Sequence, residues 1–413
     1  MVCWISRLVL VTFITGEFIQ ARAELLPGCE TQKQLATSQA GTLRGPRPGF
    51  DFSMSSSNHP IVVHATAATS EDYAQRILSY ADKSWDVIVN QMKFRAPRPD
   101  HADDADPRID IYIRGDLTPG VGGYTGFSGF YEETPEADAY GYLVIADQLK
   151  DTYIRGVVAH EFFHLVQMSY DWFEHPGFME ATAVWVTDHV FDDENFYQNY
   201  YAYYNKSPFQ SLDKISLADP YQYGAGLWFQ FLDERFGQGN GGIVKTIWEF
   251  SSQETMDTEP DYFDAMTTLL GGDQSLKSVF HEFGRWRLSV GSRAGDEHLR
   301  EAAAWPDRVI PFFIEGGAIE FNQVVQWSVL SGMQPFSHSY LRFTLPAVDK
   351  DKPVDFDFKL DSVCEGYVRA EVQRSTAEVL VILTRTFDEV YDPETSTEDS
   401  LPVSGTIRLR AAQ

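Results

Sequence analysis

The chain has 413 residues, of which 43% are hydrophobic and 14% aromatic. This is the composition of a globular protein with enough material for a sizeable core, and the length predicts two or three domains. A net charge of -27 opposes binding to nucleic acid or to an anionic membrane surface, so we set nucleic-acid binding aside.

The N-terminus has the pattern of a secretory signal peptide, residues 1–23. Arg7 precedes an apolar run from Leu8 to Ile14, and Ala21-Arg22-Ala23 has the small-x-small form of a cleavage site. Neither this run nor any later segment is long enough to span a membrane. We therefore expect a secreted or periplasmic protein without an integral membrane segment after cleavage. An uncleaved amphipathic anchor is the alternative.

Three cysteines are present, and Cys3 would leave with the signal peptide. Cys29 and Cys364 remain as an even pair in an oxidising compartment, so a disulfide between them is expected. LPGC at 26–29 weakly resembles a lipoprotein box, which leaves lipidation of Cys29 as an alternative.

The elements before residue 150 predict a small mixed α and β region. The residue pattern predicts three β-strands, over 59–66, 109–115 and 139–146. Between 70 and 94 the apolar residues recur at helical spacing. The glycine-rich stretch 120–130 is expected to be a flexible loop, and it lacks the glycine spacing of a dinucleotide or phosphate-binding loop.

The texture of the chain changes once more near residue 306. Helices dominate from 151 to about 290, whereas the rest consists of short β-rich segments separated by turn residues. The sequence thus predicts an α+β fold, with one domain over 24–305 and a small antiparallel β-sandwich over 306–413.

The stretch AHEFFHLVQ, residues 159–167, lies in a predicted helix over 152–169. On a helical wheel the apolar side chains enter the core, while His160 and His164 lie one turn apart on the opposite face with Glu161 beside them. Two imidazoles at this spacing can bind one zinc ion. An ordinary amphipathic helix with polar residues on its wet face is the alternative.

A catalytic zinc site needs a third protein ligand. Glu174 and His175 fall in a predicted connecting loop, whereas Glu180 lies in the first turn of a second helix that begins near Phe178. A helix packed beside the first can aim one rigid carboxylate at the metal, so Glu180 is the preferred ligand. The fourth position then remains open for water, as in catalytic zinc sites.

With this ligand set, Glu161 is the candidate general base for a zinc-activated water. An oxyanion donor could come from Tyr223, or from Tyr221, which precede Gly224 and Gly226 at the start of another helix. These glycines would permit close backbone approach. Two tyrosines in an aromatic-rich core are the alternative.

Three motifs together resemble the gluzincin metallopeptidases, and more narrowly a group of secreted bacterial metalloproteases. They are HEFFHLVQ, EATAVW and YGAGLWF, within a similarity that runs from about 60 to 240. The resemblance implies a zincin-like fold, in which a mixed sheet lies over the HExxH helix and the substrate follows an edge strand. Many members have Glu-Gly where this chain has Glu180-Ala181, so no substrate preference is carried over.

The leading hypothesis is a secreted zinc endopeptidase that acts on protein or peptide substrates. The second is an inactive zincin scaffold or secreted adhesion protein, although such a scaffold has no need for Glu161. The third is an aminopeptidase, which requires an acidic group for the free N-terminus; no such motif is evident before His160.

Overall fold

The computed structural model describes most of the chain after residue 46 and three residues before it. The described residues are 28–29, 31, 47–100, 106–131, 134–216, 219–252, 260–345, 354–364, 367–375, 377–387, 391–393 and 400–411. The predicted signal peptide lies outside them. The chain forms two compact units: a mixed-sheet unit (Glu24–Tyr204 with Ile215–Gly272) and a C-terminal unit (Asn205–Lys214 with Asp273–Gln413).

The mixed-sheet unit is built on six strands in the order β1-β5-β6-β4-β3-β2. Their bounds are β1 (Gly28–Cys29), β2 (Phe52–Ser55), β3 (Ile61–Ala65), β4 (Ile109–Arg114), β5 (Val121–Phe130) and β6 (Ala139–Ala146). β3, β4 and β6 are parallel, and β5 runs antiparallel to β6. The short strand β1 adds to the outer edge of β5 in parallel.

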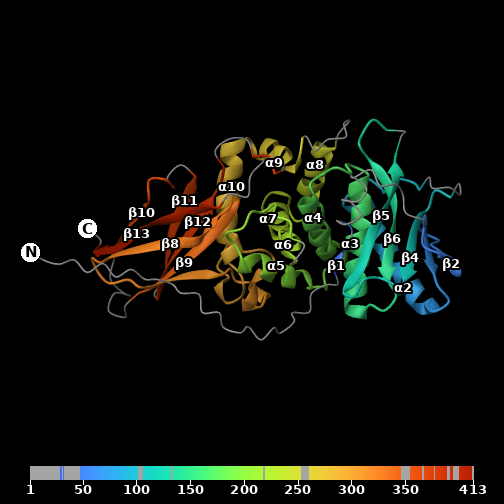
Figure 1. Ribbon diagram of the computed structural model, residues 1–413, viewed down its shortest axis with the longest axis horizontal. Coiled ribbons are helices and arrows are strands. Elements are labelled where there is room, and N and C mark those ends of the chain that lie inside the picture. Colours follow the sequence, from blue (N-terminus) through green and yellow to red (C-terminus); the bar gives the residue numbers. More distant parts are fainter. Residues whose placement is uncertain are drawn as a thin grey trace, which may run out of the picture. The chain divides into compact units, whose positions relative to one another are not determined.

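Two helices, α2 (Glu71–Ser84) and α3 (Asp151–Met168), lie next to each other against this sheet (Figure 1). α2 begins at Ser70, whose hydroxyl accepts a hydrogen bond from Tyr73 N, and continues into π-helical turns η1 (Trp85–Gln91). Successive side chains of β4 point to opposite faces of the sheet. Ile111 is fully buried, and Tyr112 packs in a separate cluster with Tyr142.

The glycine-rich stretch predicted to be a loop is instead β5, so that prediction is wrong. Glycines made it look flexible, but two of them make room for neighbouring side chains. A Cβ on Gly123 would lie 2.8 Å from Val144 O and 3.1 Å from Glu161 Cγ, and one on Gly126 would meet the ring of Tyr142. β5 therefore packs directly against the histidine helix.

The remaining helices of the mixed-sheet unit follow α3 along the chain. They are α4 (Pro176–Val190), α5 (Tyr197–Lys206), α6 (Tyr221–Gly224), α7 (Gly226–Phe236), α8 (Gly242–Ser251) and α9 (Tyr262–Leu270). α4 begins with Pro176, whose fixed φ suits a first turn, and His175 caps it by accepting from Gly177 N. α4 packs on α3 and on α6 and α7, so it lies in the middle of this helical layer.

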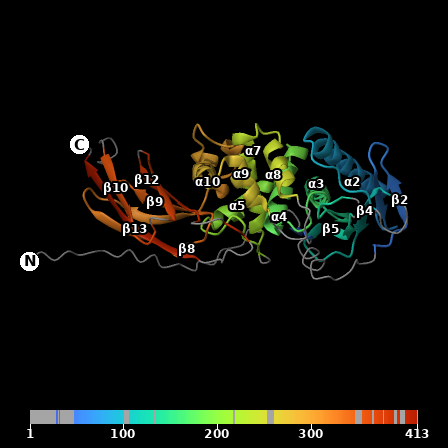
Figure 2. The same cartoon turned by 90° about the horizontal axis from the view of Figure 1, so that it is seen from above.

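The C-terminal unit carries α10 (Asp273–Leu288), three short 3₁₀ turns and two sheets. The turns are η2 (Gly291–Arg293), η3 (Ala302–Ala304) and η4 (Asp307–Val309). One sheet has the order β11-β12-β9-β7 and the other β10-β13-β8. Figure 2 shows strands of both sheets, among them β9 and β12 of the first and β8, β10 and β13 of the second. Their bounds are β7 (Phe313–Ala318), β8 (Val324–Met333), β9 (Ser337–Thr344), β10 (Val354–Leu360), β11 (Val368–Arg374), β12 (Glu378–Arg385) and β13 (Leu401–Ala411).

Both C-terminal sheets contribute to one hydrophobic core. Trp327 and Ile407 come from one sheet and Leu341 and Val381 from the other. The pairings are antiparallel except that of β7, which runs parallel to β9. The described part of the chain is therefore mixed α and β, with one mixed sheet and two largely antiparallel sheets. Its C-terminal unit combines Asn205–Lys214 with the chain from Asp273 onward.

Candidate metal centre

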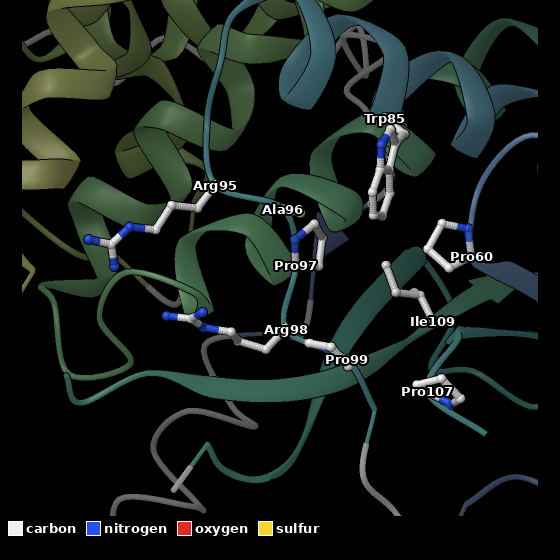
Figure 3. A pocket seen from close by; sticks show the side chains of 9 residues that line it. All are labelled: Pro60, Trp85, Arg95, Ala96, Pro97, Arg98, Pro99, Pro107 and Ile109. Atoms are coloured by element: carbon white, nitrogen blue, oxygen red, sulfur yellow. The ribbon is translucent and has the colours of Figure 1, made fainter. Parts of the chain in front are cut away.

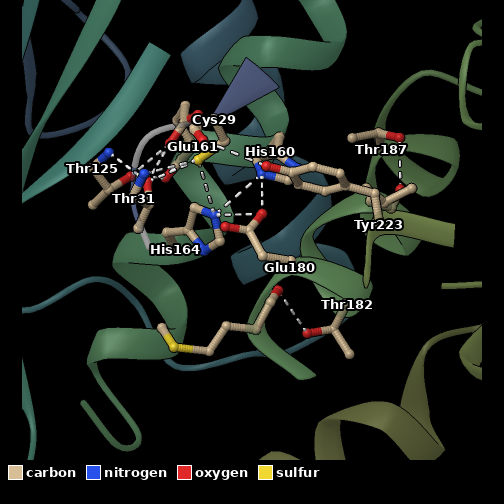
Figure 4. A network of polar contacts seen from close by, with 12 residues as sticks. Cys29, Thr31, Thr125, His160, Glu161, His164, Glu180, Thr182, Thr187 and Tyr223 are labelled. Atoms are coloured by element: carbon tan, nitrogen blue, oxygen red, sulfur yellow. Dashed lines mark hydrogen bonds and ion pairs between the residues drawn. The ribbon is translucent and has the colours of Figure 1, made fainter. Parts of the chain in front are cut away.

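The helices α3 and α4 bring the three predicted ligands together. His160 and His164 extend from α3 and Glu180 from the first turns of α4 (Figure 4). Glu180 Oε2 lies 3.1 Å from His160 Nε2 and 3.6 Å from His164 Nε2, and the two Nε2 atoms are 3.1 Å apart. Residues 169–175 separate the two helices, and the packing of α4 on α3 presents the carboxylate.

The polar face of α3 is not a wet face, which argues against the alternative of an ordinary amphipathic helix. His160, Glu161 and His164 are respectively 6%, 1% and 0% exposed. The reason is that α3 is enclosed on several sides, since it contacts the sheet, α2 and α4. Burying imidazoles and carboxylates costs free energy of desolvation, which hydrogen bonds, ion pairs or a metal must offset. The burial therefore favours a binding or catalytic site over polar residues that only share a surface.

Gln167 determines which nitrogen of His164 faces the cluster. Its Nε2 amide donates to Met179 O at 2.8 Å and to Thr182 Oγ1 at 3.0 Å, which fixes the amide orientation. Gln167 Oε1 therefore accepts from His164 Nδ1–H at 2.7 Å. His164 Nε2 is left to bind a proton or a metal at the cluster, which is the usual arrangement of a metal-binding histidine.

The cluster is electrostatically coupled. Burial alone raises the pKa of Glu180, but the charge of His164 and the hydrogen bond from His160 outweigh it and lower that pKa to about 2. Burial lowers the pKa of His164, yet the charge of Glu180 more than offsets this and the net pKa is raised. Glu180 thus stays anionic, as a metal ligand must. Its second oxygen, Oε1, is buried and has no hydrogen-bond partner among the described residues.

Cys29 supplies a fourth candidate ligand that the sequence did not reveal. Its Sγ lies 3.7 Å from His164 Nε2, and one ligand atom from each of Cys29, His160, His164 and Glu180 lies within 4.8 Å of the others. Tetrahedral coordination with bonds of about 2.0–2.3 Å separates ligand atoms by roughly 3.3–3.6 Å. The four measured separations, from 3.1 Å between the two Nε2 atoms to 3.7 Å at the sulfur, lie close to this range. The four residues therefore fit a tetrahedral divalent metal.

The predicted disulfide between Cys29 and Cys364 is absent, and that prediction is wrong. Both cysteines are free. Cys29 faces the histidines, whereas Cys364 is buried in the core of the C-terminal unit with its Sγ 3.6 Å from Pro402 O. An even number of cysteines is compatible with a disulfide but does not require one, because a thiolate is also a good metal ligand.

Glu161 lies beside the ligands and points toward β5. Thr125 Oγ1 donates to its Oε2 at 3.1 Å and to its backbone carbonyl at 3.0 Å. Thr31 Oγ1 donates to the same Oε2, also at 3.1 Å, and accepts from Thr125 N at 2.9 Å. Gly123 gives Glu161 the space to pack directly on the strand. The carboxylate is therefore held at the boundary between α3 and the sheet edge.

Tyr223 also reaches the cluster, and Tyr221 has a different environment. The ring of Tyr223 lies 5.9 Å from that of His160, and its hydroxyl lies 3.5 Å from Cys29 O. Tyr221 packs on Tyr204, with ring centroids 5.1 Å apart. Close approach at the expected glycines is present: Cβ atoms there would lie 2.4 Å from Tyr200 O for Gly224 and 2.8 Å from Ala181 O for Gly226.

A hollow elsewhere in this unit is not part of the cluster. It measures about 420 Å³ and is lined by Pro60, Trp85, Arg95, Ala96, Pro97, Arg98, Pro99, Pro107 and Ile109 (Figure 3). Arg95 pairs with Glu136 and Arg98 with Asp138, so their charges are matched within the protein. No residue of the metal cluster lines it.

The sequence missed Cys29, Thr31, Thr125 and Gln167. Gln167 follows His164 by one helical turn, and that spacing is a usable signal for a side chain that orients the histidine. Cys29 is 135 residues from His164, and no local pattern connects them. Thr125 was concealed by its position in a stretch expected to be a loop.

No protein-family model matches the chain, and no curated protein does either. Within the described residues no helix is both long and apolar enough to cross a membrane.

Proposed function

We propose that this chain is a secreted zinc-dependent peptidase, in which a zincin-like mixed-sheet unit cleaves peptide bonds and a C-terminal β-sandwich serves as an accessory domain. The observation that carries the proposal is the convergence of His160, His164 and Glu180, with Glu161 beside them on the same helix. The imidazole and carboxylate donors and their near-tetrahedral separations suit zinc.

The residues around the cluster have distinct roles in this proposal. Zinc held by His160, His164 and Glu180 would supply a Lewis acid that acidifies water and polarises a peptide carbonyl. Glu161 accepts the proton of the attacking water and passes it to the leaving amine. Thr125 holds the carboxylate of Glu161 in place through its hydrogen bond to Oε2.

Tyr223 is the proposed oxyanion donor. Its hydroxyl lies 3.5 Å from the carbonyl oxygen of Cys29, a residue that adds to the edge of β5. The hydroxyl can therefore reach a carbonyl of a peptide laid along that strand. Burial, followed by the charge of Glu180, raises the pKa of Tyr223 well above its usual value, which keeps the phenol protonated as a donor.

A second candidate function is supported by one observation. Cys29 Sγ lies with the other three candidate ligand atoms, and a site closed by cysteine is typical of structural zinc. On this alternative the unit is a scaffold or adhesion protein that holds metal without turnover. Glu161 and its two threonine partners favour the peptidase, because a structural site needs no carboxylate beside its ligands.

Metal content and peptide cleavage test the peptidase function. Zinc is measured by elemental analysis, and cleavage of a mixed peptide library is followed by mass spectrometry. Both are measured for the wild type and Cys29→Ser, each with and without Glu161→Gln. We expect stoichiometric zinc in all four proteins. We also expect cleavage by at least one of the two parents, the wild type or Cys29→Ser, and Glu161→Gln should abolish that cleavage. Folded protein without zinc, or absence of cleavage in both parents, would exclude the proposal.

A further inference from the structure

A short segment near the N-terminus contacts a proposed ligand, the proposed oxyanion donor and the proposed base. We call Gly28, Cys29 and Thr31 the Cys29 segment. Cys29 Sγ approaches His164 Nε2, its carbonyl oxygen lies within reach of Tyr223, and Thr31 donates to Glu161 (Figure 4). One short piece of the chain thus contacts a ligand, the oxyanion donor and the base, and its sulfur lies within 4.8 Å of a ligand atom of each of the other two ligands.

The Cys29 segment is held along a strand edge. Gly28 pairs with Val121 and Cys29 with Gly123, which makes β1 the outermost strand of the sheet. Thr31 adds a side-chain contact, because its hydroxyl accepts from Thr125 N. Without β1, β5 would be the edge, and an exposed strand edge is the usual place for an extended peptide to add by main-chain hydrogen bonds.

A separate feature of the cluster points to a cation. Glu180 is fully buried, and its Oε1 has no hydrogen-bond partner among the described residues. A buried carboxylate oxygen without a partner is costly unless a positive charge lies nearby. This oxygen belongs to the same carboxylate whose Oε2 faces both imidazoles, and that carboxylate forms one group of candidate ligands with Cys29 and the two histidines.

We propose that Cys29 is the fourth ligand of the metal and that the Cys29 segment occupies the peptide groove of β5, which keeps the enzyme latent until the segment is displaced. On coordination the Cys29 thiol gives its proton to solvent and binds as thiolate. On displacement the sulfur leaves the metal and takes up a proton, Thr31 releases Glu161, and the edge of β5 becomes available to an extended peptide. This inference rests on the proposed peptidase function.

The contacts also explain how the latent state would resist substrate. Three groups must be released together: the sulfur at the ligands, the Thr31 hydroxyl at Glu161 and the main chain along β5. Because the segment is tethered, it competes at an effective concentration of about 1 mM or more, which free peptides seldom reach. The inhibitor and the substrate would use the same strand edge, so only one can be bound at a time.

The test uses the full chain with cobalt(II) in place of zinc, since a thiolate ligand gives cobalt a charge-transfer absorption band in the near ultraviolet. We expect the band in the wild type, its loss in Cys29→Ser and its retention in Cys364→Ser, the matched control at the other free cysteine. A wild type that binds cobalt without the band, or a band that survives Cys29→Ser, would refute the ligand assignment.

Peptidase rates of the zinc proteins test latency separately. Because the tethered segment acts at about millimolar effective concentration, we expect Cys29→Ser to cleave peptides at least about tenfold faster than the wild type, with Cys364→Ser unchanged. Thr31→Val, which keeps the sulfur ligand but frees Glu161, should also be faster and should retain the cobalt band. Equal rates for the wild type and Cys29→Ser would overturn latency and leave the peptidase function intact. Absence of cleavage in every variant would instead remove the peptidase function.

Discussion

Gln167 orients His164 through a hydrogen bond of 2.7 Å, and its own amide is fixed by Met179 O. The side chain thus decides which imidazole nitrogen faces Glu180, although it touches no other member of the cluster. A residue that orients a metal ligand contributes to affinity because a free imidazole must lose rotational freedom and adopt the correct tautomer when it binds.

Gln167→Leu should weaken metal binding by about 10–100-fold, the usual effect of removing such a partner. The side chains have similar size, so the fold should persist, although the carbonyl of Met179 loses a donor. Affinity is measured by competition with a chromogenic chelator. Gln75→Leu, at an exposed position of α2, is the control and should leave the affinity unchanged. Equal affinities for both variants would show that Gln167 does not orient the ligand.

Gly123→Ala should destabilise the protein and displace Glu161. The new Cβ would lie 2.8 Å from Val144 O, a backbone atom of the paired strand that cannot move aside cheaply. Overpacking of this kind costs about 1–3 kcal/mol, measured as the free energy of unfolding in urea. Gly49→Ala is the control, because a Cβ there has no atom within 4 Å. In the Cys29→Ser background, we also expect Gly123→Ala to slow cleavage without loss of bound metal.

The sequence predicted those parts of the site that depend on local geometry. His160 and His164 share one helix, and Glu180 follows after a single turn, so spacing alone brings them close. Spacing alone does not distinguish Tyr223, because other buried tyrosines have a similar local pattern. Its proximity to His160 depends on how α6 packs against α4, which is a tertiary property.

Where local rules failed, the cause was tertiary structure. The glycines of β5 have high intrinsic flexibility, but Gly123 and Gly126 are required by the packing of Glu161 and Tyr142. The strand therefore forms despite poor β-propensity. The Cys29 thiol was assigned to a disulfide because only the count of cysteines could be used. Its place beside His164 depends on the pairing of β1 with β5, which no local pattern reveals.

His338 should make the C-terminal unit less stable in mild acid. Burial, and then the charge of Arg287, lower its pKa well below the usual value, and its Nε2–H donates to Phe280 O. Below about pH 6.5 the unfolded chain binds a proton that the folded chain rejects, so stability falls as the pH falls, by at most about 1.4 kcal/mol per unit. Above that pH both states are neutral and this contribution is absent.

The measurement compares urea unfolding of the wild type and His338→Gln between about pH 7.5 and about pH 5.5. Gln can keep a donor for Phe280 O but does not titrate in this range. As the pH is lowered, the unfolding free energy of the wild type should fall relative to that of His338→Gln. A difference that is constant over the whole range would show that His338 is protonated equally in both states.

Tyr223→Phe should lower kcat and leave KM and the bound metal nearly unchanged. The hydroxyl reaches the position of a peptide carbonyl on β5, whereas the ring packs on His160 and Tyr200, so Phe preserves the packing and removes only the donor. Loss of one oxyanion donor costs about 10²–10³-fold in kcat. Rates are measured in the Cys29→Ser background, in which the carbonyl of residue 29 should no longer compete for this hydroxyl.

Tyr221→Phe is the matched control two residues away, and the ring of Tyr221 packs on Tyr204. Its kcat should stay within about twofold of the parent, since the removed hydroxyl is not the proposed oxyanion donor. If both variants lost activity equally, packing of the tyrosine pair would be the cause, and Tyr223 would have no role at the oxyanion.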